Sequence, residues 1–199
     1  MLHNHEEIEA KFLNININDI EQKLKETGAT KVGEYFQKWT TFDYPDWRLD
    51  KEGAWIRLRD EGNGEISLSF KKRLGMISRE GNTNDQGMQE IEIKVNDFEK
   101  TSLIFKAMGF AVKHYAEKKR IRWAKQDVEF DIDIYPELEP YIEIETTSWE
   151  KIESEAKLIG LNYEDKKIFS ANQVYAMKGI DVGKLLKISF TDGLVERKD

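Results

Sequence analysis

Residues 7–11 (EIEAK) alternate charged and apolar positions near the start of the chain. Read as a strand, this alternation places the first, third and fifth side chains on one face and the isoleucine and alanine on the other. The pattern recurs in residues 90–94 (EIEIK) and, without the lysine, in residues 143–145 (EIE). A strand face with this much charge must contact solvent or other charged groups. The three stretches therefore predict β-strands with one strongly charged face.

The 199-residue chain is acidic overall, with a formal net charge of −7, and 35% of its residues are charged. Aromatic residues make up 11%, which indicates a folded protein with a buried core. The negative net charge disfavours binding of duplex nucleic acid. Because the chain has no cysteine, disulfides, zinc–thiolate sites and a cysteine nucleophile are excluded. The sequence shows no secretory signal and no apolar run of membrane-spanning length, so we expect a cytoplasmic protein without a membrane partner.

The two halves of the chain repeat one order of elements: an acidic strand, a capped helix and a basic hairpin. Asn18 is the expected N-cap of the first helix, and residues 96–99 (NDFE) carry the same signature in the second half. Such a repeat suggests two similar halves that make one structure. The expected strands are 6–13, 32–42, 54–59, 66–73, 90–94, 112–124, 127–134 and 141–145.

The remaining segments complete a single domain over residues 1–190. A third helix is expected to begin at Thr147 and to stop at Gly160. Residues 74–88 are expected to form a polar loop, and residues 163–190 to add a helix or two. We expect residues 191–199 to be a disordered tail.

The amphipathic helices need an apolar surface to cover, and only one set of strand faces offers it. The charged faces must then point away from the helices. Because a large antiparallel sheet tends to curl or close, we expect an α+β fold: a closed eight-stranded antiparallel β tunnel with a charged interior and helices packed outside. The charged faces carry Glu7, Glu9, Lys11, Arg57, Arg59, Lys71, Arg73, Glu90, Glu92, Lys94, Lys118, Arg120, Arg122, Glu129, Asp131, Asp133, Glu143 and Glu145.

The two signs of charge are sorted, so that some strands are acidic and others basic. Sorted charge is self-repelling unless a ligand neutralises it. Basic strands favour an anion of high charge density, and clustered carboxylates favour a divalent metal. A polyphosphate with bound Mg²⁺ or Mn²⁺ satisfies both requirements. The alternative is an open sheet with one solvated face, on which the charges form ordinary cross-strand pairs.

Six short motifs follow one another in a fixed order. They are Glu-x-Glu-x-Lys at 7–11, Arg-x-Arg at 57–59, Leu-Ser-Phe-Lys at 68–71, Glu-x-Glu at 90–92, Lys-x-Arg at 118–120, and Asp133 followed by an aromatic-x-Glu-x-Glu run at 141–145. Over about residues 6–163 this order resembles the CYTH, or triphosphate tunnel metalloenzyme, superfamily. The layout is most similar to its prokaryotic class IV adenylyl cyclase-like branch. Residues 37–41 (QKWTT) depart from the Gln-x-Asp-x-Tyr that the family often has, which leaves the substrate open.

The resemblance implies roles for the charged residues. The catalytic residues would be Glu7, Glu9, Lys11, Arg57 and Arg59. The triphosphate would be held by Lys11, Arg57, Arg59, Lys71, Lys118 and Arg120. One or two Mg²⁺ or Mn²⁺ ions would be held by Glu7, Glu9, Glu143 and Glu145, assisted by Asp131 and Asp133, while Glu90 and Glu92 would bind metal or orient the cations. For Arg73, Lys94, Arg122 and Glu129, which lie outside the motifs, we expect salt bridges or positions at the rim.

The resemblance also implies a metal-dependent enzyme whose substrate is a small-molecule triphosphate. The first expectation is adenylyl cyclase-like chemistry, in which ATP gives cyclic AMP and pyrophosphate. A triphosphatase acting on thiamine triphosphate, inorganic tripolyphosphate or a nucleoside triphosphate is the alternative. A polyphosphate- or nucleotide-binding module without turnover is a further reading, which the retained carboxylates disfavour. A sheet of this size could also support a homodimer.

Overall fold

The computed structural model describes residues 8–73 and 88–197. Glu7 and residues 74–87 of the expected loop lie outside this range. The described residues form ten strands of one sheet, together with five α-helices and two 3₁₀ turns. The chain divides into two compact units: unit 1 is Met1–Phe36 with Lys118–Lys184, and unit 2 is Gln37–Glu117 with Leu185–Asp199.

Unit 1 is an antiparallel sheet in the order β1-β8-β7-β6-β2. Its strands are β1 (Ile8–Phe12), β8 (Tyr141–Thr146), β7 (Val128–Ile134) and the unit 1 portions of β6 (Ala111–Lys125) and β2 (Thr30–Asp43). The strand β1 is the end of the hydrogen-bonded path in this unit. These bounds confirm the strands expected from the alternation of charged and apolar residues.

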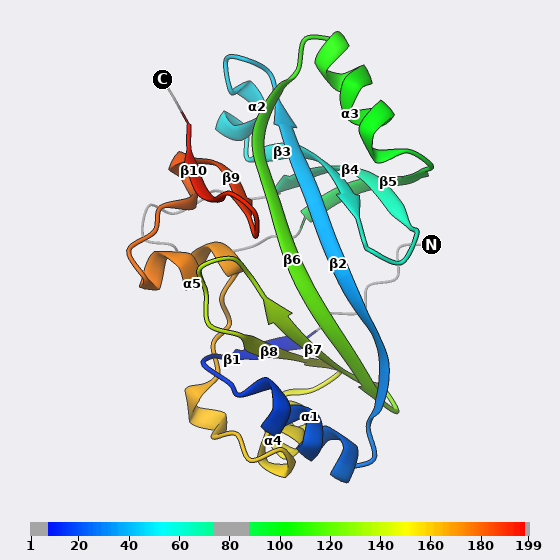
Figure 1. The fold of residues 1–199 in the computed structure, drawn as a ribbon, viewed down its shortest axis with the longest axis vertical. Helices are drawn as coiled ribbons and strands as arrows, with labels where there is room; N and C mark the ends of the chain where they lie inside the picture. Colours follow the sequence, from blue (N-terminus) through cyan, green and yellow to red (C-terminus); the bar gives the residue numbers. More distant parts are fainter. Residues whose placement is uncertain (1–7, 74–87, 198–199) are drawn as a thin grey trace. The chain divides into compact units, whose positions relative to one another are not determined.

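The apolar face of unit 1 is covered by α1 (Ile17–Glu26) and α4 (Trp149–Leu158), which Figure 1 shows beside β1, β8 and β7. Leu24 of α1 and Ile152 of α4 are fully buried against the strands. The fully buried strand residues of this core include Phe130 and Ile144, which alternate with charged neighbours along their strands. The helices therefore cover the apolar faces of these strands, as the sequence predicts.

Unit 2 contains the other ends of β6 and β2, followed by β3 (Ala54–Asp60), β4 (Ile66–Arg73) and β5 (Met88–Val95). Their pairing is antiparallel, and β5 is the end of the path. The helix α3 (Phe98–Ala107) packs on the apolar face, where the ring of Phe105 stacks on Phe42 with their centroids 5.0 Å apart. The short helix α2 (Arg48–Lys51) after β2 was not expected.

The helix starts differ slightly from the expected ones. The N-cap of α1 is Asn16, whose side chain accepts a hydrogen bond from the backbone N–H of Asp19, and not Asn18. The earlier start brings Ile17 into one stripe with the buried residues that follow it. Asp97 caps α3 and Ser148 caps α4, each one residue later than the sequence signature suggested.

Unit 1 ends with a largely helical segment, which agrees with the expectation for residues 163–190. The segment contains η1 (Tyr163–Asp165), α5 (Ala171–Met177) and η2 (Val182–Lys184). The buried Tyr175 of α5 donates a hydrogen bond from its hydroxyl to the carbonyl of Pro136, 2.7 Å away. This bond ties the segment to the turn after β7.

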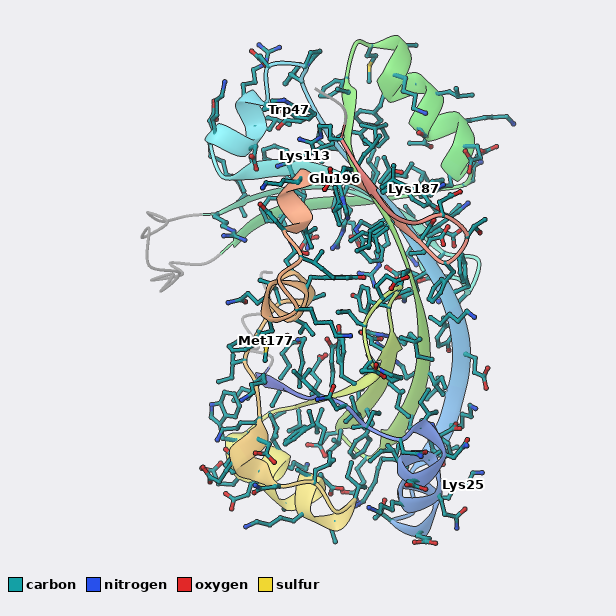
Figure 2. All side chains as sticks on the ribbon, turned by 60° about the vertical axis from the view of Figure 1, so that its left-hand side comes forward. Lys25, Trp47, Lys113, Met177, Lys187 and Glu196 are labelled. Carbon is teal, nitrogen blue, oxygen red and sulfur yellow. The ribbon has the colours of Figure 1, made fainter. Side chains whose placement is uncertain are left out.

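The C-terminal end of the chain differs from the expected disordered tail. The strands β9 (Leu185–Ser189) and β10 (Gly193–Glu196) form an antiparallel hairpin, and β9 pairs in parallel with β6. After β10, Arg197 donates a hydrogen bond to the carbonyl of Lys113 and lies over the ring of Trp47, 4.6 Å from its centroid; Figure 2 labels both of these partners. An Asp-Gly turn between two apolar runs is the signal that could have predicted this hairpin.

The opposite environments of two strand isoleucines give a stability prediction. Ile144 of β8 is 0% exposed, whereas Ile93 of β5 is 56% exposed. We expect Ile144→Ala to lower the free energy of unfolding by about 2–5 kcal/mol, since it leaves a cavity. The matched variant Ile93→Ala should change it by about 0.5 kcal/mol or less. Urea unfolding measures both, and equal losses would contradict the burial described above.

A second prediction concerns His114, whose Nδ1 lies 3.1 Å from the carbonyl oxygen of Leu185 in β9. Burial lowers the pKa of His114, and the nearby charges of Arg197 and Lys113 lower it further, against the opposing effect of this hydrogen bond. The unfolded chain therefore takes up a proton first as the pH falls below about 6.5. We expect stability to be fully present above that pH and to fall below it. In His114→Gln, unfolding midpoints measured between pH 7.5 and 5 should show a shallower fall; an unchanged slope would contradict this.

Candidate functional site

On the charged face of unit 1, Lys11 lies between two carboxylates. Its side chain is 4% exposed, and Nζ lies 2.8 Å from Glu9 Oε1 and 3.1 Å from Glu143 Oε1. Burial by itself would lower the pKa of Lys11, but Glu143 and Glu9 outweigh it and raise this pKa above its usual value. Lys11 is therefore held as an ammonium ion between two of the carboxylates predicted to bind metal.

The strands β6 and β7 carry a buried ionic cluster. Asp133 is 0% exposed and accepts hydrogen bonds from Lys118 at 2.8 Å and from Arg120 at 2.6 Å. Arg120 also contacts Asp131 at 2.5 Å and Glu143 at 2.7 Å. Burial opposes ionisation of Asp133, but Lys118 and Arg120 outweigh it and hold its pKa below the usual range. In this arrangement Lys118 and Arg120, which we predicted to hold phosphate, are already paired with carboxylates.

A row of carboxylates crosses three neighbouring strands of unit 1. Glu9 of β1 is in register with Glu145 of β8, which is in register with Glu129 of β7. Carboxylate oxygens are the donors that Mg²⁺ and Mn²⁺ prefer, so the chemistry of this row fits a divalent metal. Among residues 8–73 and 88–197, however, no three acidic or histidine side chains converge as a ready-made metal cage.

On the charged face of unit 2, Arg59 is held by two neighbours. Its Nη2 donates a hydrogen bond to Gln37 Oε1 at 3.0 Å, and its Nε lies 2.8 Å from Glu61 Oε1. Gln37 in turn donates from Nε2 to Glu61 Oε2 at 2.8 Å. Gln37 is 4% exposed, so this three-residue ring fixes the orientation of the guanidinium.

Arg57 differs from every other cation of the predicted site. It makes no hydrogen bond or ion pair within the part of the chain that the structure describes, and its Nε is buried without a partner. Burial lowers the pKa of Arg57 and the neighbouring Arg59 lowers it further, while Glu90, Glu61 and Glu92 act only at a distance. A buried guanidinium without a counter-ion is costly, and this points to an anionic ligand.

The acidic residues of β5 were predicted either to bind metal or to orient the cations. Glu90 lies 2.8 Å from Lys71, which is one of the residues predicted to hold phosphate. Glu92 is exposed and is in register with Ser69. The residues expected to form salt bridges include Lys94, which pairs with Glu65 at 2.5 Å.

The predicted residues are distributed over the two units. Unit 1 brings together Glu9, Lys11, Lys118, Arg120, Asp131, Asp133, Glu143 and Glu145, and unit 2 brings together Arg57, Arg59, Lys71, Glu90 and Glu92. The salt bridges of Arg122 with Asp131 and Glu129 agree with the expectation for residues outside the motifs. Sequence reasoning missed Glu61, although it continues the two-residue spacing of Arg57 and Arg59 one residue beyond the end of β3.

Comparison with known proteins supports the assignment of the fold. The model of the CYTH domain matches residues 5–174. The chain belongs to the CYTH family. Its mostly antiparallel sheet with few helices is the tunnel-like fold of this family, so the predicted fold class is confirmed. The described sheet has ten strands and not the eight expected, and its hydrogen-bonded path ends at β1 and β5.

The chain is similar to several proteins of this kind. A Methanocaldococcus jannaschii protein named "putative adenylate cyclase" is 25% identical over 187 residues, which cover 94% of this chain and 97% of the relative. A structure from Vibrio parahaemolyticus with the same name matches with a TM-score of 0.64 and 16% identity, covering 85% of this chain and 97% of the other. A Hippeastrum protein described as having a dominant triphosphatase activity matches with a TM-score of 0.58 and 18% identity, covering 86% and 96%.

The helices of this CYTH chain are short. Within residues 8–73 and 88–197, none of them combines the length and the apolar character that crossing a bilayer requires.

The contrast between Arg57 and Arg120 gives a prediction for the ligand-free protein. Arg57→Met removes an unpaired buried guanidinium and should raise the free energy of unfolding by about 1–3 kcal/mol. Arg120→Met leaves Asp131 and Asp133 without their main partner and should lower it by about 3–5 kcal/mol. Chemical denaturation without phosphate in the buffer measures both variants. A loss of stability in Arg57→Met as large as that in Arg120→Met would contradict the unpaired state of Arg57.

Proposed function

We propose that this CYTH protein is a divalent-metal-dependent enzyme that acts on a small-molecule triphosphate. In this proposal Arg57, Arg59 and Lys71 bind phosphate. Glu9, Glu143 and Glu145 hold the divalent metal. The observation that carries the proposal is Arg57, whose buried Nε has no hydrogen-bond partner among the residues that the structure describes.

The first candidate activity is adenylyl cyclase-like conversion of ATP to cyclic AMP and pyrophosphate. It is supported by the name of the Methanocaldococcus jannaschii relative, which spans nearly the whole chain. The second candidate is hydrolysis of a triphosphate, which is supported by the activity ascribed to the Hippeastrum protein of the same fold. Both reactions need the same neutralisation of phosphate charge, so the charged residues serve either one.

The residues of unit 2 would bind and orient the phosphate chain. Arginine forks make bidentate contacts with phosphate oxygens, whereas lysine acts as a point charge. Arg59 would approach the phosphate with its orientation set by Gln37 and Glu61, and Lys71 with its orientation set by Glu90. Such fixed cations neutralise charge that develops on the phosphate oxygens without having to reorganise during the reaction.

The residues of unit 1 would hold the metal. The CYTH family implies a divalent ion, and Mg²⁺ and Mn²⁺ both fit oxygen donors. When bound, the ion would supply Lewis-acid neutralisation of the phosphate charge. Asp131 and Asp133 remain candidates for assisting ligands, although Arg120 engages both. The role of Glu7 and the presence of a homodimer stay predictions.

The products decide between the candidate activities. The purified protein is incubated with ATP, tripolyphosphate or thiamine triphosphate, each with Mg²⁺ or Mn²⁺, and the products are separated by chromatography. Cyclic AMP with pyrophosphate identifies a cyclase, and orthophosphate identifies a triphosphatase. Tight binding without turnover would contradict the enzyme and support a binding module.

Single variants test the assigned residues. We expect Glu9→Ala and Arg57→Ala each to lower kcat/KM on the best substrate by about 100-fold or more, since each removes charge that stabilises the reacting phosphate. Both should keep the circular dichroism spectrum of the wild type, because neither side chain belongs to the apolar cores. The matched control Lys94→Ala removes an exposed cation from the charged face of unit 2. This variant should retain wild-type rates. Wild-type rates in both site variants would overturn the assignment.

A further inference from the structure

A second buried polar group without a partner lies beside Arg57. The hydroxyl oxygen of Ser69 makes no hydrogen bond within the described part of the chain, although this residue is only 1% exposed. Ser69 of β4 is directly in register with Arg57 of β3. Residues in register on antiparallel strands point to the same face, with Cα atoms about 4.5–5.5 Å apart. The two unpartnered groups are therefore neighbours on the charged face of unit 2.

Two adjacent unpartnered polar groups are unusual in a folded protein, because most buried hydroxyl and guanidinium groups are hydrogen-bonded. Each such group loses its hydration without replacement, which costs about 1–3 kcal/mol. The next pair along the same two strands differs from this one. Ser67 is in register with Arg59, whose Nη2 donates to Gln37 and whose Nε lies 2.8 Å from Glu61 in an ion pair, although this Nε makes no well-directed hydrogen bond within residues 8–73 and 88–197. Among the described residues, Arg59 therefore has side-chain partners, whereas Arg57 has none.

We propose that Arg57 and Ser69 form a two-donor subsite for a single phosphoryl group of the triphosphate. The Ser69 hydroxyl donates a hydrogen bond to one non-bridging oxygen, and the Arg57 guanidinium donates to the same phosphoryl group. This inference rests on the proposed function and extends it, because it assigns binding to a neutral side chain that no charge pattern identifies. Arg59 acts differently, as a pre-oriented cation whose position does not depend on the ligand.

The exposed carboxylate of Glu92 is the third member of this row, in register with Ser69 on the next strand. A carboxylate so close to a phosphate oxygen is repulsive unless a cation lies between them. Binding at this subsite should therefore be stronger with Mg²⁺ present than without it. For this reason the binding experiments include both conditions.

Titration calorimetry with tripolyphosphate, with and without Mg²⁺, tests the subsite. Ser69→Ala should weaken binding about tenfold or more, the usual loss for a hydrogen bond to a charged acceptor. Ser69→Thr keeps the hydroxyl and should bind within about threefold of the wild type. The matched control Ser67→Ala removes a hydroxyl two residues away on the same face and should bind as the wild type does. Equal affinities for Ser69→Ala and the wild type would overturn the proposal.

Urea unfolding of the ligand-free protein distinguishes a loss of phosphate binding from a loss of stability. Since the Ser69 hydroxyl has no hydrogen-bond partner among residues 8–73 and 88–197, Ser69→Ala should keep or raise the urea midpoint of the ligand-free protein. The same variant should show a smaller rise of the midpoint on addition of tripolyphosphate than the wild type does. A lower ligand-free midpoint with an unchanged response to tripolyphosphate would mean a purely structural role, which contradicts the proposal.

A double-mutant cycle tests whether the two groups share one phosphoryl group. If they do, Ser69→Ala should weaken tripolyphosphate binding much less in an Arg57→Met background than in the wild type. Additive losses would overturn the shared subsite. Failure of the proposed function has a different signature: the wild type itself would neither bind nor convert any of the three triphosphates. A wild type that binds while Ser69→Ala is unchanged would refute only the subsite.

Discussion

The cost of burying charge is the constraint on which the rest of this structure depends. Strands such as β7, β8 and β3 present one face to an apolar core and the other to a dense array of carboxylates, ammonium groups and guanidinium groups. Such charges are tolerated away from bulk water only when they are paired. In unit 1 this requirement is met within the protein, where Asp133, Arg120 and Glu143 form a continuous network. In the described part of unit 2 it is met for Arg59 and Lys71 but not for Arg57.

This unequal pairing separates supporting residues from residues that are open to a ligand. A charge pattern alone treats Arg57, Arg59, Lys118 and Arg120 as equivalent phosphate ligands. The structure shows that three of them already have close carboxylate partners. A ligand that binds those three must compete with the carboxylates or use them to recruit metal, whereas a ligand at Arg57 gains a previously unpaired donor. The predicted phosphate ligands therefore differ in whether they have a carboxylate partner, although the sequence motifs treat them alike.

Much of the fold follows from the strand period of two and from helix capping. The alternating residues of β4 gave its bounds correctly, and glycines with positive φ follow α1 and α3 where stops were expected, at Gly28 and Gly109. The cap of α1 was misplaced because several asparagines precede it, and packing of Ile17 chooses among them. The β9–β10 hairpin was missed because its strands are short and are held by contacts far away in sequence, such as that of His114 with Leu185.

The sequence by itself determined which residues are charged, which strand face they share and in what order they occur, because side-chain direction along a strand depends only on local geometry. That was enough to identify the CYTH family and to name the candidate site residues. Only the tertiary structure decided how these charges are paired. Register between strands and side-chain geometry place Gln37 and Glu61 against Arg59. They also place Ser69 beside Arg57, with no hydrogen-bond partner for its hydroxyl among the described residues. Hydrogen bonding acts over about 3 Å, so which groups are satisfied depends on neighbours distant in the chain.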